Sequence, residues 1–98
     1  MVHVIVRHKV SDYSKWKQVF DAYLNHRMAA GETGFRVFQS IEDPRDITLV
    51  LDWEGLDSAR RFMKSDDVRH TMQNAGVVGD PEVNYVQDAV TVRRTSAD

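Results

Sequence analysis

The sequence contains no cysteine, and this absence excludes a disulfide framework, a thiol nucleophile and any metal site built from cysteine. It also contains no apolar run of about 18 residues that would suit a transmembrane helix. Its first residues, MVHVIVRHK, alternate apolar and polar side chains instead of forming the apolar core of a signal peptide. We therefore expect a cytoplasmic protein with no membrane partner.

Motifs of several common active sites are missing as well. There is no glycine loop that would cradle a phosphate, no Ser-His-Asp order and no paired-carboxylate motif. We predict neither a metal nor a cofactor. A net charge of -2, and the lack of an aromatic-glycine pattern in the strand DITLVLDWE, argue against a nucleic-acid partner.

The residues that are present suit one globular domain. The chain has 98 residues, of which 42 % are hydrophobic, so it can form a single core over residues 1–98. Alternation with a period of two residues predicts strands over residues 2–9, 35–41, 46–53 and 82–92. We predict a loop over residues 76–81 and a flexible tail from about residue 93.

Helical spacing accounts for the remaining segments. A first helix is predicted to start at Ser11 or Asp12 and to stop near Gly31, with a stripe of apolar residues at Tyr13, Trp16, Phe20, Tyr23, Leu24 and Met28. A second helix over residues 57–64 is predicted to break at Ser65, which can cap a third. The resulting order, β-α-β-β-α-β, predicts an α+β ferredoxin-like fold, in which helices cover one face of a four-stranded antiparallel sheet.

The predicted sheet has apolar side chains on both faces. Ile5, Phe38 and Val50 are opposite in parity to the residues that should face the helices. One layer of helices cannot cover both faces, and an exposed apolar patch usually marks an interface. We therefore predict a homodimer whose two sheets pack face to face into a barrel. The alternative is a monomer with a few valines on its surface.

Two stretches carry a resemblance to a known superfamily: VIVRHKVSDYSKWKQVFD and LVLDWEGLDSARRFMKSDDVRHTMQNAGVVGDPEVNYV. Through them the sequence resembles the dimeric α/β-barrel superfamily, near its antibiotic-biosynthesis-monooxygenase-like and cyclase group. An apolar strand that ends in Trp53-Glu54 and is followed by Ala59, Phe62 and Ser65 resembles the signature typical of this group. The resemblance covers residues 2 to 90. It implies a ferredoxin-like fold, a homodimer and, for the activity, a cofactor-independent monooxygenase or a polyketide cyclase.

Departures from the superfamily's patterns argue against haem degradation. In haem-degrading relatives, a histidine lies seven residues after the serine that opens the last helical segment, and here that position is Met72. His70 is two residues away, which is about 200° around a helix. The aromatic residue that would shield the haem corresponds to Phe62 instead of a tryptophan. We carry over no catalytic residue from any relative.

The candidate catalytic residue is His8. It ends the first strand with the parity of Val4 and Val6, so it should face the helices. An imidazole has a pKa near neutrality and could act as a general base toward a phenol or an acidic carbon. The structural alternative is a histidine bonded to the start of the first helix, or to Asp12 or Tyr13.

The candidate ligand-binding residues could line a space between sheet and helices: Trp16, Trp53, Phe62, His70, Met72 and Tyr85. The alternative for the aromatic residues and Met72 is an ordinary hydrophobic core. His70 lies four residues after Asp66, on the same helix face, but two ligands are too few for a metal site, and a solvated pair is the alternative. Arg27 and Arg36 could bind an acidic group, although lone arginines are usually solvated.

Together these features predict a homodimer that binds a flat, hydrophobic or aromatic small molecule between sheet and helices. If the protein is an enzyme, the resemblance implies oxygenation without a cofactor, with His8 as the base. One alternative is a non-catalytic ligand-binding or regulatory module, and another is a protein whose sheet face serves only assembly. A cavity above about 300 Å³ with His8 or His70 pointing into it would favour binding or catalysis.

Overall fold

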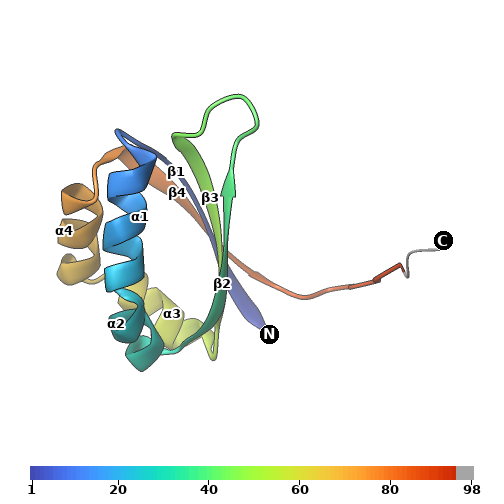
Figure 1. Cartoon of the computed structure of the whole chain (residues 1–98). Coiled ribbons are helices and arrows are strands. Elements are labelled where there is room, and N and C mark those ends of the chain that lie inside the picture. The colour runs from blue at the N-terminus through green and yellow to red at the C-terminus, as the bar shows by residue number, and fades with distance from the viewer. Residues whose placement is uncertain (95–98) are drawn as a thin grey trace.

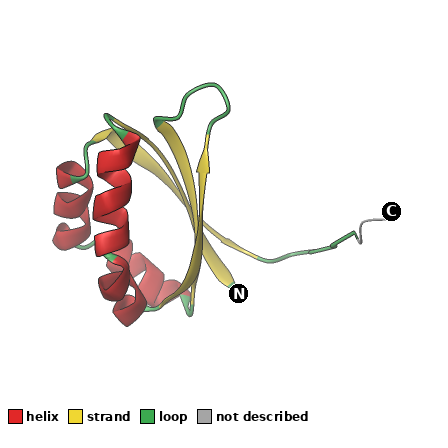
Figure 2. Ribbon diagram, in the orientation of Figure 1, coloured by secondary structure: helices red, strands yellow, loops and turns green. Residues whose placement is uncertain are grey.

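The computed structural model describes residues 1–94 and shows one antiparallel sheet with helices on one face (Figure 1, Figure 2). The elements in chain order are β1 (Val2–Val10), α1 (Tyr13–Ala22), α2 (Leu24–Ala30), β2 (Glu32–Gln39), β3 (Asp46–Trp53), α3 (Leu56–Met63), α4 (Asp66–Asn74) and β4 (Val77–Gln87). The strands lie in the order β2-β3-β1-β4. This confirms the predicted ferredoxin-like α+β fold. Residues 95–98 of the tail predicted to be flexible lie outside the described residues.

Alternate residues of the two central strands build the face of the sheet that the helices cover. Val4 of β1 pairs with Leu51 of β3, and Val6 pairs with Leu49, and all four side chains are buried. The residues between them, such as Ile5, point to the opposite face because successive side chains in a strand alternate. The sequence therefore predicted correctly which residues of these strands face the helices and which face the opposite side.

The predicted boundaries of two strands are wrong by several residues. β2 begins at Glu32 instead of residue 35. β4 covers Val77–Gln87 instead of residues 82–92, so most of the loop predicted over residues 76–81 belongs to a strand. Local composition suggested a loop there, but pairing with a neighbouring strand overrides such local preferences.

The end of β1 explains why β4 begins early. Val10 pairs with Val77 and Lys9 with Val78, so the last residues of β1 find their backbone partners in the predicted loop. Gly76 makes the turn that allows this pairing. Its φ of 86° lies in the left-handed region, where a side chain would be strained.

The first predicted helix is interrupted at Tyr23, whose φ of -88° and ψ of 0° separate α1 from α2. In a continuous helix, the carbonyl of Phe20 would accept a hydrogen bond from the amide of residue 24. Here it accepts one from Nη1 of Arg27. The predicted apolar stripe therefore fails after Tyr23, because the buried face of α2 carries Arg27 while Met28 is 56 % exposed.

The second helical region is broken where the sequence predicts. α3 ends at Met63, and the Ser65 hydroxyl then caps α4 by accepting a hydrogen bond of 3.3 Å from the amide of Val68. Asp12 caps α1 in the same way by accepting from the amide of Lys15. These short polar side chains satisfy amide groups that have no partner inside their helix.

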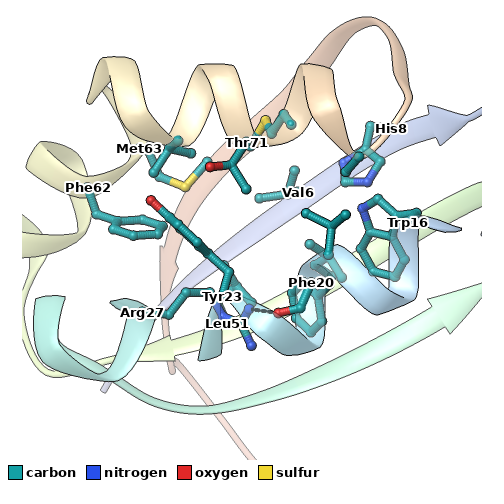
Figure 3. A pocket seen from close by; sticks show the side chains of 15 residues that line it. Val6, His8, Trp16, Phe20, Tyr23, Arg27, Leu51, Phe62, Met63 and Thr71 are labelled. Atoms are coloured by element: carbon teal, nitrogen blue, oxygen red, sulfur yellow. Dashed lines mark hydrogen bonds between the residues drawn. The ribbon is translucent and has the colours of Figure 1, made fainter. Parts of the chain in front are cut away.

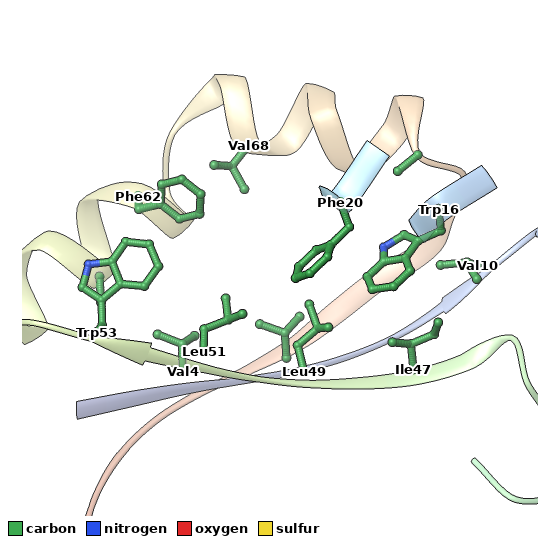
Figure 4. Close-up of a cluster of buried hydrophobic side chains, with 13 residues drawn as sticks. Val4, Val10, Trp16, Phe20, Ile47, Leu49, Leu51, Trp53, Phe62 and Val68 are labelled. Carbon is green, nitrogen blue, oxygen red and sulfur yellow. The ribbon is translucent and has the colours of Figure 1, made fainter. Parts of the chain in front are cut away.

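A hydrophobic core fills most of the space between sheet and helices (Figure 4). Its buried members are Val4, Val6, Val10, Trp16, Phe20, Ile47, Leu49, Leu51, Trp53, Ala59, Phe62, Val68 and Ala75. The rings of Trp16 and Phe20 stack with their centroids 4.9 Å apart. Burying one large apolar side chain stabilises a fold by about 1.5–3 kcal/mol, so this layer holds the helices against the sheet.

No helix among residues 1–94 covers the opposite face of the sheet (Figure 1). Phe38 and Val86 are 47 % and 38 % exposed there, and Ile5 and Val50 are half-buried between them. Cross-strand ion pairs lie among these apolar side chains. One of them joins Arg7 to Asp46, with 2.9 Å between nitrogen and oxygen.

Candidate functional site

A cavity of about 60 Å³ lies between the covered face of the sheet and the helices (Figure 3). It is lined by Val6, His8, Trp16, Val19, Phe20, Tyr23, Arg27, Leu49, Leu51, Phe62, Met63, Val68, Thr71, Met72 and Ala75. Most of these side chains are apolar or aromatic. The cavity is far smaller than the ~300 Å³ typical of a ligand site, and smaller than the ~150 Å³ cavity that holds benzene in an engineered protein.

His8 lies at one end of this cavity, on β1, where only 5 % of the residue is exposed. Its ring centroid is 5.7 Å from that of Trp16, at an interplanar angle of 60°. Neither ring nitrogen has a hydrogen-bond partner within residues 1–94, so the structural alternative of a bond to Asp12 or Tyr13 is not seen. Burial lowers the pKa of His8, against a weaker opposing effect of Asp46. The imidazole is therefore neutral at pH 7 and has a free lone pair.

An irregularity in the sheet lies directly beside His8. Between Arg7 and Lys9 on β1, the pairing partner on β4 jumps from Glu82 to Val78, so three residues of β4 lie opposite His8 alone. Gly79 takes a φ of 73° within this bulge. Bulges often lie next to functional side chains, because they change where a neighbouring side chain points and interrupt the regular pairing.

Arg27 lies at the other end of the cavity and is buried, with 3 % of the residue exposed. Its Nε donates a hydrogen bond of 2.9 Å to Oε1 of Glu32, the first residue of β2, which is also buried. The centre of the guanidinium is 3.7 Å from the ring centroid of Phe20 and 5.3 Å from that of Phe35. The arginine is thus fixed on four sides, by a carboxylate, the Phe20 carbonyl and two aromatic rings.

Two polar atoms of this ion pair have no hydrogen-bond partner among the described residues, namely Nη2 of Arg27 and Oε2 of Glu32. Burial raises the pKa of Glu32, and the charge of Arg27 opposes this shift. A buried ion pair stabilises a fold only when its remaining donors and acceptors are satisfied. This pair is incompletely satisfied, so it is suited to receive a further polar group.

The expectation that Arg27 is solvated is wrong. Arg27 lies seven residues after Phe20 and eleven after Trp16, spacings that return to the same face of a helix. A charged residue in phase with an aromatic stripe, followed five residues later by Glu32, was the signal available in the sequence. Arg36 is exposed on β2, as expected, with its guanidinium 5.8 Å from the Phe38 ring.

Four of the residues proposed from the sequence line the cavity: His8, Trp16, Phe62 and Met72. Trp53 is not among the lining residues, because it lies in the core behind Phe62, with 4.9 Å between the ring centroids. Tyr85 on β4 is half-buried beside the core, and its ring lies 5.6 Å from the guanidinium centre of Arg60. The structure therefore separates these two aromatic residues from the cavity.

His70 is exposed on α4 and lines neither hollow that the structure shows between its described elements. Its expected partner, Asp66, is bonded instead to Arg69, with 2.9 Å between nitrogen and oxygen. His70 is therefore not part of the site. Tyr23 takes a place that sequence reasoning did not give it, since its hydroxyl is buried beside the cavity without a partner among residues 1–94.

A second hollow, a groove of about 300 Å³, lies between α4 and the start of β4. It is lined by Met63, Lys64, Ser65, Val68, Arg69, Met72, Gln73, Val77, Gly79, Asp80, Pro81 and Val83. Met63, Val68 and Met72 line both this groove and the inner cavity. These three side chains form the wall between the two hollows, and methionine side chains adopt new rotamers readily.

Within the described residues, no group of three histidine, aspartate or glutamate side chains could hold a metal ion. None of the helices described here is long and apolar enough to cross a membrane. His3, which has the opposite parity to His8, lies on the uncovered face and donates hydrogen bonds to Asp52, at 2.6 Å, and to Asp88. Bonding to Asp88, and then to Asp52, raises the pKa of His3.

Comparison with known proteins finds no matching protein-family model and no matching curated protein. Solved structures do match. One, a protein from Bordetella bronchiseptica that carries the name of the antibiotic biosynthesis monooxygenases, is 24 % identical over 91 % of this chain and 97 % of its own, with a TM-score of 0.77. SnoaB, a cofactor-independent oxygenase from Streptomyces nogalater, is 14 % identical over 93 % of this chain and 95 % of its own, with a TM-score of 0.76.

A third structure, from Nitrosomonas europaea and also named for these monooxygenases, is 14 % identical over 92 % of this chain and 100 % of its own, with a TM-score of 0.70. These structural neighbours are antibiotic-biosynthesis-monooxygenase-like proteins, in agreement with the resemblance found in the sequence. At identities this low, the likeness establishes the shared fold alone.

Proposed function

We propose that this protein binds a flat aromatic molecule in the cavity between sheet and helices and oxygenates it without a cofactor, with His8 as the base. The observation that carries the proposal is the state of His8. A buried, neutral imidazole with two free nitrogens lies beside Trp16 on the wall of an otherwise apolar cavity. A general base needs a free lone pair at the working pH, and burial provides it here.

The reaction needs no electron donor besides the substrate. The unprotonated nitrogen of His8 takes the hydroxyl proton of a phenol, and the electron-rich anion then reacts with oxygen. A carbon–oxygen bond forms, the oxygen–oxygen bond breaks, and the ring loses one hydrogen. The products are a quinone and one water molecule, so atoms and electrons balance. The apolar walls keep water away from the reacting anion. SnoaB, a cofactor-independent oxygenase, has the same fold, which supports this choice of chemistry.

The ligand requires more room than this cavity of about 60 Å³ offers. Movement of Met63 and Met72 would join the cavity of about 60 Å³ to the groove of about 300 Å³ beside it. The combined space reaches the range that holds a small ring system. Met72 belongs to α4, which begins after the short break at Ser65, so a displacement of α4 would widen this opening.

A non-catalytic binding module is the second candidate, and one observation favours it. Catalytic bases are usually oriented by a further polar group, and within residues 1–94 no such group bonds to the ring of His8. A binding protein needs only the cavity. The two candidates differ in whether bound phenol is consumed.

The experiment that separates them measures oxygen uptake and quinone formation with 1-naphthol and related phenols. The wild type should consume oxygen, and His8→Ala should lose at least about 100-fold in rate, a typical contribution of a general base. His70→Ala is the matched control, because that histidine is exposed and should leave the rate unchanged. Binding without oxygen uptake would reject the enzymatic proposal and leave the binding module.

We also propose that the protein is a homodimer joined through the uncovered sheet face. The apolar residues of that face have no cover from their own chain among the residues described. After β4 the chain leads away from the sheet (Figure 1), and Val90 and Val92 on this segment are 84 % and 80 % exposed. A second copy facing the first would cover both the sheet and these valines.

A further inference from the structure

We infer that the ligand carries one carboxylate and that Arg27 receives it, at the end of the cavity opposite His8. This inference rests on the proposed ligand cavity and names the class of ligand that fits it, an aromatic monocarboxylic acid. Figure 3 draws His8 and Arg27 at opposite ends of the cavity. A ligand that spans the cavity would therefore present its carboxylate to Arg27 and its ring to His8.

Arg27 is held in place before any ligand arrives. Glu32 bonds its Nε, the Phe20 carbonyl bonds its Nη1, and the Phe20 ring lies against its flat face at 3.7 Å. The remaining nitrogen, Nη2, is buried and has no partner in the described part of the chain. A guanidinium donor that is shielded from water and unbonded is costly, so a ligand oxygen at this nitrogen gains more than it would at a solvated arginine.

When Glu32 is protonated, Arg27 gives the site one positive charge, which limits the ligand to a single negative charge. Arg27 is the one permanently charged residue among those that the structure shows lining the cavity. A phosphate or sulfate dianion would leave an uncompensated charge in apolar surroundings, which is strongly unfavourable. A carboxylate is planar, singly charged and matched to the guanidinium geometry.

Glu32 determines how strongly the carboxylate is held. When Glu32 is ionised it already neutralises Arg27, and a second carboxylate would give the buried cluster a net negative charge. When Glu32 is protonated, the charge of Arg27 is available to the ligand. Burial favours the protonated form by raising the pKa of Glu32. Glu32 and the ligand therefore compete for one cation.

The test compares pairs of ligands that differ only in charge, benzoate with benzamide and 2-naphthoate with 2-naphthamide, by calorimetric titration of the full chain at pH 7. The wild type should bind each carboxylate at least about tenfold more tightly than its amide, because a hydrogen bond to a charged group contributes that much. Glu32→Gln keeps an acceptor for Nε and removes the competing charge, so its preference for the carboxylate should rise further, by roughly tenfold.

Arg27→Gln alone would leave Glu32 buried without its cation, so the second variant combines Arg27→Gln with Glu32→Gln, and its fold is checked by circular dichroism. This double variant should bind both members of each pair equally and should retain the wild-type affinity for the amides. Equal binding of acid and amide by the wild type, or a preference that survives in the double variant, would overturn the inference and leave the ligand cavity intact. If none of the probes binds, the proposed ligand cavity and this inference fail together.

Discussion

His3 and His8, five residues apart on β1, show how strand parity sets the chemistry of a side chain. His8 faces the helices, where burial lowers its pKa. His3 faces the other way, where hydrogen bonds to Asp88 and Asp52 raise its pKa. The same residue type on one strand is therefore harder to protonate on one face of the sheet and easier to protonate on the other. These two shifts have opposite consequences for stability as the pH changes.

His3→Gln should remove a stabilising effect that exists only when the imidazole is charged. Because folding raises the pKa of His3, its contribution is fully present below about pH 6.5, the value in the unfolded chain, and is lost as the pH rises through the folded value. Urea unfolding at pH 6 and pH 9 measures this. The difference in unfolding free energy between wild type and variant should shrink at pH 9, and a constant difference would contradict the assignment.

His8→Gln should change the pH dependence in the opposite direction. Folding lowers the pKa of His8, so below about pH 6.5 the unfolded chain gains a proton that the folded protein excludes, and the wild type loses stability. The variant lacks this loss. Between pH 7.5 and pH 5, the unfolding midpoint should therefore fall by less in the His8→Gln variant than in the wild type. Equal slopes would mean that His8 is accessible to protons in the folded state.

For single residues, the sequence predicted correctly that His8 faces the helices, but it did not predict that Arg27 is buried. Strand parity is a rigid geometric rule, so the side to which His8 points follows directly from its position after Val4 and Val6. The burial of Arg27 depends on the helix break at Tyr23, and that break is stabilised by Arg27 itself through the Phe20 carbonyl. Such a mutual dependence between a side chain and a backbone break cannot be read from residue spacing.

Among the elements, the junction between α2 and β2 is the most constrained. Gly31 ends α2 with a φ of 130°, and its carbonyl accepts a hydrogen bond of 2.9 Å from the amide of Glu54. A Cβ atom at this position would lie 2.7 Å from Nε1 of Trp53. The junction thus brings the end of α2 against the end of β3 and sets the position of Glu32 beside Arg27.

Gly31→Ala should destabilise the protein by more than about 1 kcal/mol, because it adds left-handed strain to a clash with the buried Trp53 ring. Urea unfolding followed by tryptophan fluorescence would measure the loss. Gly55→Ala is the matched control, since φ is -162° there and the nearest atom to a new Cβ is Ser58 Oγ at 3.8 Å. Equal effects of the two substitutions would show that the contact at Gly31 does not constrain the fold.

The elements themselves could largely be predicted, and the error at the start of β4 has a cause outside the local sequence. Helix caps at Asp12 and Ser65 depend on local chemistry, and both occur where predicted. The start of β4 depends on which backbone groups of β1 remain unpaired, so the glycines and proline of residues 76–81 were misleading. Local signals locate helix ends well, whereas strand ends are decided by the partner strand.

For the whole molecule, the uncovered sheet face is the surface through which we propose that two chains associate. It carries Phe38, Val86, Ile5 and Val50 alongside ion pairs, so it is neither a typical core nor a typical solvent face. The face belongs to the same strands that form the cavity on their other side. Dimer formation would therefore stiffen the floor of the cavity without contributing residues to its covered side.

Phe38→Glu should convert the proposed homodimer into a monomer, because it would bury a charge in the proposed interface. Light scattering coupled to size exclusion should give twice 11.3 kDa for the wild type and 11.3 kDa for the variant. Ile41→Glu is the control, since that residue is fully exposed in the link between β2 and β3. A monomeric wild type would reject the dimer.

The central claim is that an aromatic ligand occupies the cavity between sheet and helices beside His8. Nuclear magnetic resonance of the four histidine rings during titration with 2-naphthoate tests it most directly. His8 should shift in proportion to the bound fraction, while the exposed His70 should keep its chemical shifts. Binding that leaves the His8 signals unchanged, or that moves His70 instead, would contradict the account.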